Sequence, residues 1–107
     1  MQDVVEVQAA TCGIILEEVL QGIHPAEHVG EACRSLLKHT YLDTPQAVYL
    51  KAAEYIRHCR RKGLGLSTVD ALIAAVAAQH EAELWTLGKD LIRAGSFLSV
   101  ELYPSLQ

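Results

Sequence analysis

The stretch that decides the fold is STVDALIAAVAA, residues 67–78. Alanine is the best helix former, and neither glycine nor proline interrupts the stretch, so it predicts one continuous helix. Alanines fill much of the helix circumference, which indicates close packing on more than one side. We therefore expect a core helix with a single acidic residue, Asp70, in its first turn. The larger apolar side chains recur at helical spacing and give this helix a wide apolar face: Val69, Leu72, Ile73 and Val76.

Asp70 has two interpretations, a helix cap or a functional site. Ser67 followed three residues later by Asp70 is typical of a capping box. A negative charge at this position also suits the positive end of the helix dipole. The alternative is a carboxylate that serves a site at the mouth of a core helix. The local sequence favours the cap, because such caps are common, and the rest of the chain has to decide.

The length and composition predict one globular domain over residues 1–107. The chain is 50% hydrophobic and 21% charged, as in ordinary globular proteins, and it is long enough to bury its own core. The formal net charge of -4 argues against a strongly basic nucleic-acid clamp. It does not exclude a site that binds nucleic acid through a metal ion.

The cysteines and the N-terminal residues indicate a cytoplasmic protein. Cys12, Cys33 and Cys59 lie far apart without a C-x-x-C pair, so neither a zinc ribbon nor a disulfide framework is indicated. Free thiols in a reducing cytosol are expected instead. The N-terminus lacks the charged-then-apolar layout of a signal peptide. No uncharged apolar run approaches the roughly 18 residues of a membrane span, so no membrane segment is expected.

Strands and helices are predicted to alternate, which indicates an α/β domain with a largely parallel sheet. The predicted helices lie near residues 25–39, 44–62 and 67–79, with a short one after residue 88. The predicted strands lie over 40–43, 83–86 and 99–103.

An early strand followed by a short helix is predicted within residues 8–22. Thr11, Ile14 and Ile15 favour the strand, and Gly13 would interrupt a helix there. The helix would then run over residues 17–22 and carry Glu18 in its first turn.

The helix over residues 44–62 has clear signals at both ends. Thr44 and Pro45 are typical of an N-cap and a first helical residue. The other end reads RHCRRKG, residues 57–63, where cations suit the dipole and the glycine closes the helix. These dipole-matched cations need no further function. The alternative is that three of them contact nucleic-acid phosphates: Arg60, Arg61 and Lys62.

Three segments together resemble the PIN-domain family, especially the small VapC-like toxins of bacterial and archaeal toxin–antitoxin pairs. They are TCGIILEEVLQGI over residues 11–23, LSTVDALIAA over 66–75, and LWTLGKD over 84–90. Each motif is weak alone, and their order and spacing over roughly residues 9–103 carry the resemblance.

The resemblance implies a three-layer α/β/α fold with a mostly parallel sheet and a metal-dependent ribonuclease site. In that family, acidic residues at the carboxyl ends of parallel strands hold Mg²⁺ or Mn²⁺, and the ion supports RNA cleavage. The residues that match the family's acids are Glu18, Asp70 and Asp90, and Thr68 resembles a hydroxyl that orders them. The resemblance also implies RNA as substrate and an antitoxin-like protein as partner.

The chain departs from the family at its N-terminus. The family opens with a buried strand that ends in an aspartate, about thirty or more residues before the glutamate. Here Glu18 has only 17 residues before it, and no apolar strand precedes Asp3. We therefore expect an N-terminally truncated PIN-like fold that lacks the first strand and its aspartate. A different start site, a natural truncated relative, or a sheet completed by another chain would each account for this.

Three functional hypotheses follow. The first is a PIN-like ribonuclease with weakened metal binding, because affinity follows ligand count. The second is a non-catalytic remnant that acts as a protein-interaction or oligomerisation module. The third is an unrelated α/β binding module. Missing sheet strands would leave edges and apolar surface that favour pairing, so we expect a homodimer.

Overall fold

The computed structural model describes residues 10–84, 89–95 and 98 of the 107-residue chain. The chain divides into two compact units, with the division between Leu42 and Asp43. Each unit is described by itself below. The single domain over residues 1–107 stays a prediction.

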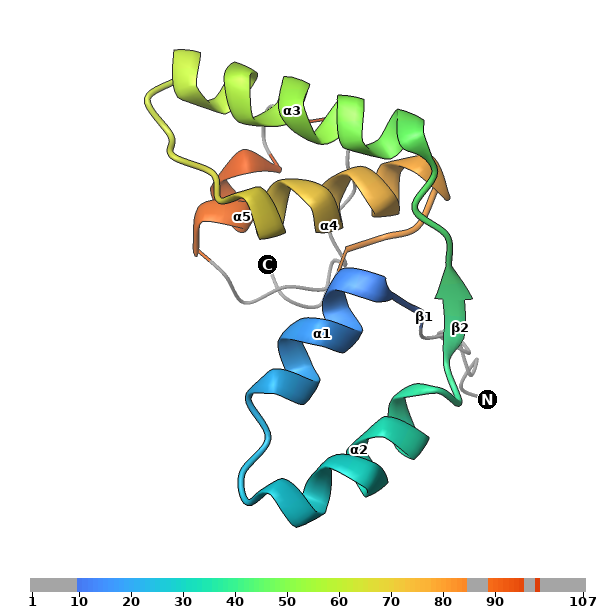
Figure 1. The fold of residues 1–107 in the computed structure, drawn as a ribbon. Helices are drawn as coiled ribbons and strands as arrows, with labels where there is room; N and C mark the ends of the chain where they lie inside the picture. The colour runs from blue at the N-terminus through green and yellow to red at the C-terminus, as the bar shows by residue number, and fades with distance from the viewer. Residues whose placement is uncertain (1–9, 85–88, 96–97, 99–107) are drawn as a thin grey trace, which may run out of the picture. The chain divides into compact units, whose positions relative to one another are not determined.

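The first unit is a strand–helix–helix–strand arrangement with a parallel pair of strands (Figure 1). β1 pairs with β2 in the register Ala10 with Thr40, Thr11 with Tyr41, and Cys12 with Leu42. Parallel strands need a crossover connection, and the two helices supply it. The parallel pairing confirms the predicted α/β class, and β2 confirms the predicted strand after residue 39. The elements are β1 (Ala10–Cys12), α1 (Gly13–Gln21), η1 (Ala26–His28), α2 (Val29–Leu36) and β2 (Thr40–Leu42).

The early strand is shorter than predicted, and the helix after it is longer. β1 ends at Cys12 and α1 begins at Gly13, so the prediction of a strand through Ile15 and a helix from residue 17 is wrong. Gly13 starts the helix, and a Cβ at this position would lie 3.1 Å from the Tyr41 hydroxyl oxygen. The absence of a side chain therefore lets the two segments approach closely. As a consequence, Glu18 lies more than one turn inside α1 and not in its first turn.

The second unit is built around two long helices, α3 (Gln46–Arg61) and α4 (Thr68–Gln79), and a short helix, α5 (Lys89–Ala94). Figure 1 shows α3 and α4 side by side and antiparallel, with α5 beside the beginning of α4. The alanines of α4 lie deepest, whereas three of the four larger apolar residues expected to form its core face are only half-buried. Small side chains let neighbouring helices approach closely. The buried side chains of the three helices are Val48, Ala52, Tyr55 and Cys59 from α3, Ala71, Ala74, Ala75, Val76 and Ala77 from α4, and Leu91 and Ala94 from α5.

Both long helices end in the same hydrogen-bonded arrangement. At the end of α3, Gly63 donates to the Arg60 carbonyl at 3.1 Å and Leu64 donates to the Cys59 carbonyl at 2.8 Å. Gly63 has a φ of 80°, which glycine adopts without a Cβ penalty. The glycine therefore ends α3 as the sequence predicts.

The end of α4 repeats this arrangement without a glycine. Glu81 donates to the Ala78 carbonyl at 3.3 Å, and Ala82 donates to the Ala77 carbonyl at 2.8 Å. Glu81 adopts a φ of 53°, which costs free energy because its Cβ crowds the backbone. The ring of His80 donates from Nε2 to the Asp43 carbonyl at 2.8 Å, which ties the end of α4 to the first residue of this unit.

The remaining predictions about elements have mixed outcomes. The helix after residue 88 is confirmed as α5, and α3 begins one residue later than predicted, with Pro45 as its N-cap. Of the predicted strand over 83–86 only residues 83 and 84 are described, and the predicted strand over 99–103 lies wholly outside the described residues. Among the helices that are described, none has the length and apolarity to span a membrane.

Candidate functional site

The N-cap of α4 makes its hydrogen bond with the backbone of Asp70 and not with the Asp70 side chain. The Asp70 N–H donates to the Ser67 hydroxyl oxygen at 3.1 Å, so Ser67 is the N-cap that the sequence predicts. The side chain of Asp70 is half-buried in the first turn, and within the described residues its carboxylate has no hydrogen-bond or ion-pair partner. The cap therefore leaves both carboxylate oxygens available, and the two interpretations of Asp70 are compatible.

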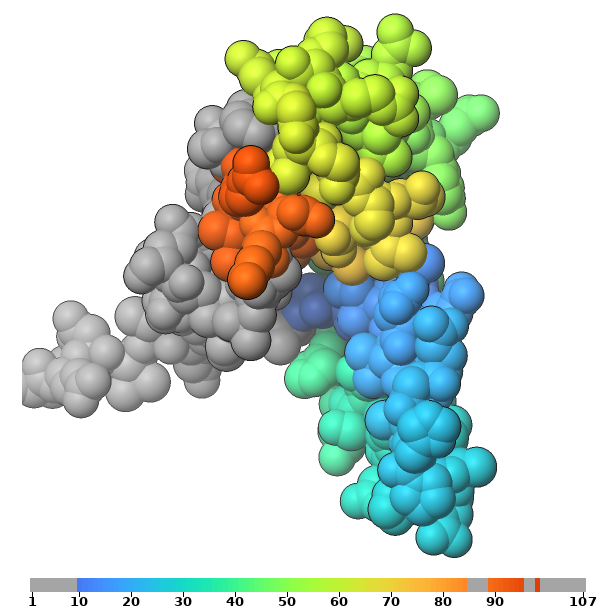
Figure 2. Space-filling model, turned by 90° about the vertical axis from the view of Figure 1, so that its left-hand side faces the viewer, coloured from blue at the N-terminus to red at the C-terminus, as the bar shows by residue number. Residues whose placement is uncertain are grey.

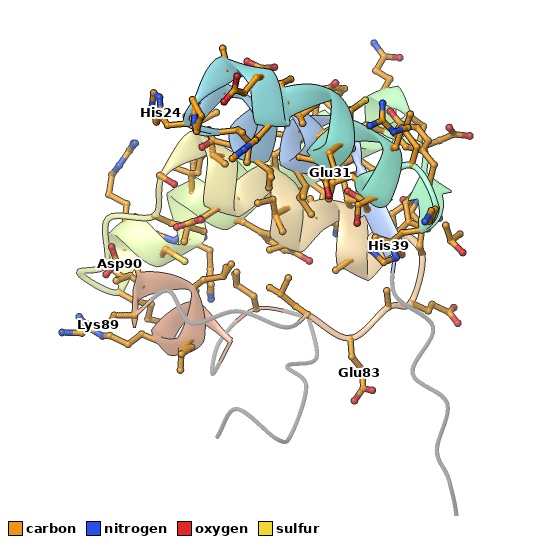
Figure 3. The ribbon with its side chains drawn as sticks, turned by 90° about the horizontal axis from the view of Figure 1, so that it is seen from below. His24, Glu31, His39, Glu83, Lys89 and Asp90 are labelled. Carbon is orange, nitrogen blue, oxygen red and sulfur yellow. The ribbon has the colours of Figure 1, made fainter. Side chains whose placement is uncertain are left out.

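Asp90 lies in the first turn of α5 and is exposed. The buried side chains of Leu91 and Ala94 hold α5 in the core of the second unit, where it contacts α4. Figure 3 shows Asp90 and Lys89 at the start of α5, beside the loop that connects α3 to α4. Because α5 also lies beside the beginning of α4, Asp70 and Asp90 belong to the same end of the second unit.

Glu18 is an exposed residue in the second turn of α1 and belongs to the first unit. Its convergence with Asp70 and Asp90 therefore stays a prediction. Within residues 10–84, 89–95 and 98, no three or more His, Cys, Asp or Glu side chains form a group that could hold a metal ion. The chemistry of the three acids still suits Mg²⁺ or Mn²⁺, because these hard cations prefer carboxylate oxygens.

Two further sets of predicted residues flank the start of α4. Thr68 is the first residue of α4 and is exposed. The predicted phosphate contacts lie at the end of α3 and are exposed as well; one of them, Arg61, has its Nη2 3.5 Å from the His58 ring Nδ1. Only the loop over residues 62–67 separates this end of α3 from α4. The predicted cations are Arg60, Arg61 and Lys62.

Two polar residues of the structure, Thr11 and Lys89, were not predicted as site residues from the sequence. Thr11 is 3% exposed, and its hydroxyl has no hydrogen-bond partner among the described residues. The only signal was a hydroxyl in an apolar run, which β-propensity alone explains. Lys89 is exposed beside Asp90 at the start of α5, and the sequence does not show that this helix lies beside the loop that follows α3.

The cysteines are free thiols, as predicted. Cys12 and Cys59 are buried and Cys33 is half-buried. Burial raises the pKa of the Cys59 thiol, so this side chain is a neutral core residue. Cys59 therefore supplies no thiolate to the site.

The sequence matches the PIN domain family over residues 3–96, which is most of the chain. The chain belongs to the PIN-domain family. This membership confirms the predicted family and the α/β fold class, and it gives the chain a nuclease-type fold. PIN domains generally depend on divalent metal ions, generally bind RNA and can pair with antitoxins. The comparison with curated proteins gives no match. The VapC-like character and the loss of the first strand with its aspartate stay predictions.

Proposed function

We propose that this PIN domain is a metal-dependent ribonuclease of the toxin–antitoxin type with low activity. Glu18, Asp70 and Asp90 would hold one Mg²⁺ or Mn²⁺ ion, and the Thr68 hydroxyl would orient the Asp70 carboxylate. When bound, the divalent ion supplies Lewis-acid stabilisation of the phosphate and an activated water. The carboxylates themselves neutralise and position the ion, which three acids without a fourth do weakly.

One observation carries this proposal: the N-cap of α4 uses the Asp70 backbone and leaves its carboxylate unpartnered among the described residues. A carboxylate that served only as a cap partner would gain from a hydrogen bond of its own. Here the fold gains its hydrogen bond from the N–H, so the acid remains available for a ligand. The position of Asp90 at the same end of the second unit adds a second carboxylate to that region.

The test is calorimetric titration of the chain with Mn²⁺. We expect binding heat for the wild type and none for Asp70→Asn, which keeps the N–H that Ser67 accepts. Asp43→Asn is the matched control, because Asp43 is an exposed aspartate of the same unit and offers only its backbone carbonyl to His80. Binding heat in Asp70→Asn equal to that of the wild type would remove the metal site from Asp70.

A non-catalytic interaction module is the second candidate, and the exposed apolar side chains favour it. Tyr49 is 55% exposed and Leu50 66% exposed on α3, and Leu37 and Tyr41 are similarly exposed in the first unit. Exposed apolar surface of this kind suits a homodimer or an antitoxin-like partner in the cytoplasm. Light scattering that shows a stable monomer at micromolar concentration would count against the homodimer.

A further inference from the structure

We infer that the second unit carries a phosphate-binding surface for single-stranded RNA that works without a metal ion. This inference rests on the proposed function and deepens it, because it assigns RNA binding to residues other than the three acids. The surface, here named the basic end, consists of the cations in and after the last turns of α3 and at the start of α5: Arg57, Arg60, Arg61, Lys62 and Lys89.

The basic end concentrates positive charge in a chain that is negative as a whole. It holds five of the nine lysines and arginines, although the formal net charge is -4. All five side chains are exposed. Arg60 and Arg61 lie three and four residues after Arg57, so the three side chains lie on one face of α3. That face points away from the core, because Cys59 on the opposite side of the helix is fully buried.

Two elements that are distant in sequence contribute to the basic end. Figure 2 looks directly at this end, and the surface of α5, in orange, adjoins the yellow-green surface of the loop that follows α3. Figure 3 places Lys89 beside the same loop. A line of cations that spans two elements can contact successive phosphates of one strand.

Internal structure does not account for these charges. The ion pair of Lys51 with Glu54 lies elsewhere on α3. Arg57, Arg60, Lys62 and Lys89 have no acidic partner among the described residues. The helix dipole explains cations in the last turn of α3. It does not explain Lys89, because a cation in the first turn of α5 meets the positive end of the dipole. A polyanionic ligand is the partner that all five cations suit.

The occupant is the RNA backbone, because the basic end adjoins the start of α4 and of α5, where Asp70 and Asp90 lie. A strand held by the cations would pass beside these acids. The acids repel phosphate when no metal ion is bound, so the cations have to provide the attraction that brings RNA to this end.

The experiment measures binding of a fluorescein-labelled 20-nucleotide oligouridine to the full chain by anisotropy, in EDTA and over a series of KCl concentrations. Each phosphate contact on a single strand contributes about 0.7 to the slope of log affinity against log salt. We expect a slope of about -3.5 for the wild type and a loss of about 2 from that slope in Arg60→Ala/Arg61→Ala/Lys62→Ala. At about 100 mM KCl this variant should bind on the order of 100-fold more weakly.

Two further variants make the result specific. Arg34→Ala/Lys38→Ala/Lys51→Ala removes the same charge from exposed positions outside the basic end and should bind RNA like the wild type. Lys89→Ala should lose about 0.7 of the slope, which tests the contribution of α5. Circular dichroism verifies that each variant keeps its helices.

Three outcomes overturn the inference. The first is equal weakening by the two triple variants, which would make the effect one of net charge. The second is wild-type affinity in Arg60→Ala/Arg61→Ala/Lys62→Ala. The third is displacement of the RNA by polyglutamate as effectively as by unlabelled oligouridine, which would identify an acidic-peptide site. Because all measurements are made in EDTA, they stand apart from the Mn²⁺ titration that tests the proposed metal site.

Discussion

Replacing Ser67 with alanine and Asp70 with asparagine separates what holds α4 from what this region of the molecule can bind. Ser67→Ala removes the oxygen that accepts the Asp70 N–H at 3.1 Å. Asp70→Asn keeps that N–H and the shape of the side chain but removes the charge. We therefore expect Ser67→Ala to lower the stability of the fold without loss of metal binding, and Asp70→Asn to lose metal binding with little loss of stability.

The magnitudes follow from the cap geometry. Loss of a serine N-cap costs about 1 kcal/mol, which lowers the melting temperature of a domain of this size by about 4–8 °C. Asp70→Asn loses only the interaction of its charge with the helix dipole, about 0.5 kcal/mol. Since the Asp70 side chain does not engage Ser67, the double variant should show nearly additive losses, with a coupling below about 0.5 kcal/mol.

The assay is thermal melting by circular dichroism with and without Mn²⁺. A ligand at ten times its dissociation constant stabilises the folded state by about 1.4 kcal/mol, so the wild type and Ser67→Ala should both gain several degrees. Asp70→Asn should gain none. A loss of stability in Asp70→Asn as large as that in Ser67→Ala would refute the reasoning, because it would mean that the carboxylate itself holds the helix.

Three further predictions concern stability and reactivity. Glu81→Gly should stabilise the chain by about 1 kcal/mol in urea titrations, because glycine adopts the φ of 53° without strain, whereas Glu81→Ala should give no such gain. Gly63→Ala should destabilise by about 1 kcal/mol although open space surrounds the position, and Gly63→Asn by less, since the φ of 80° alone is responsible. The raised pKa of Cys59 means that the folded state binds the thiol proton more tightly than the unfolded chain, so stability is full below the ordinary pKa of 9.0 and declines as pH rises above it. Cys59→Ala should have a lower melting temperature at neutral pH but a smaller further decline above pH 9, and an undiminished decline would contradict the assignment.

The central helix and its ends could be predicted from the sequence because local rules decide them. Ser67 as N-cap and Gly63 as the end of α3 depend on hydrogen bonds within a few residues, and both are confirmed. The end of β1 could not be predicted in this way. Thr11 and Ile15 have high β-propensity, but the helix begins at Gly13, because tertiary context overrides weak propensities.

The candidate site was predicted from family resemblance and only in part from residue chemistry. Local patterns could identify Asp70 as an acid in a first turn, whereas Asp90 was assigned from the resemblance, and in the structure it lies in the first turn of α5. Spacing along the chain carries no information on whether Glu18, in another unit, reaches them. The charge distribution was also partly missed, since the contribution of Lys89 depends on where α5 lies and not on the sequence around it.

The backbone cap of α4 has a consequence for how this chain can change over generations. Because the N–H at position 70 makes the hydrogen bond, any residue other than proline can preserve it, so the fold places little demand on the side chain there. Selection for a folded protein and selection for its chemistry therefore act on different atoms of the same residue. A lineage could silence the acid at position 70 by one codon change and still inherit an intact helix, and it could regain the acid just as readily.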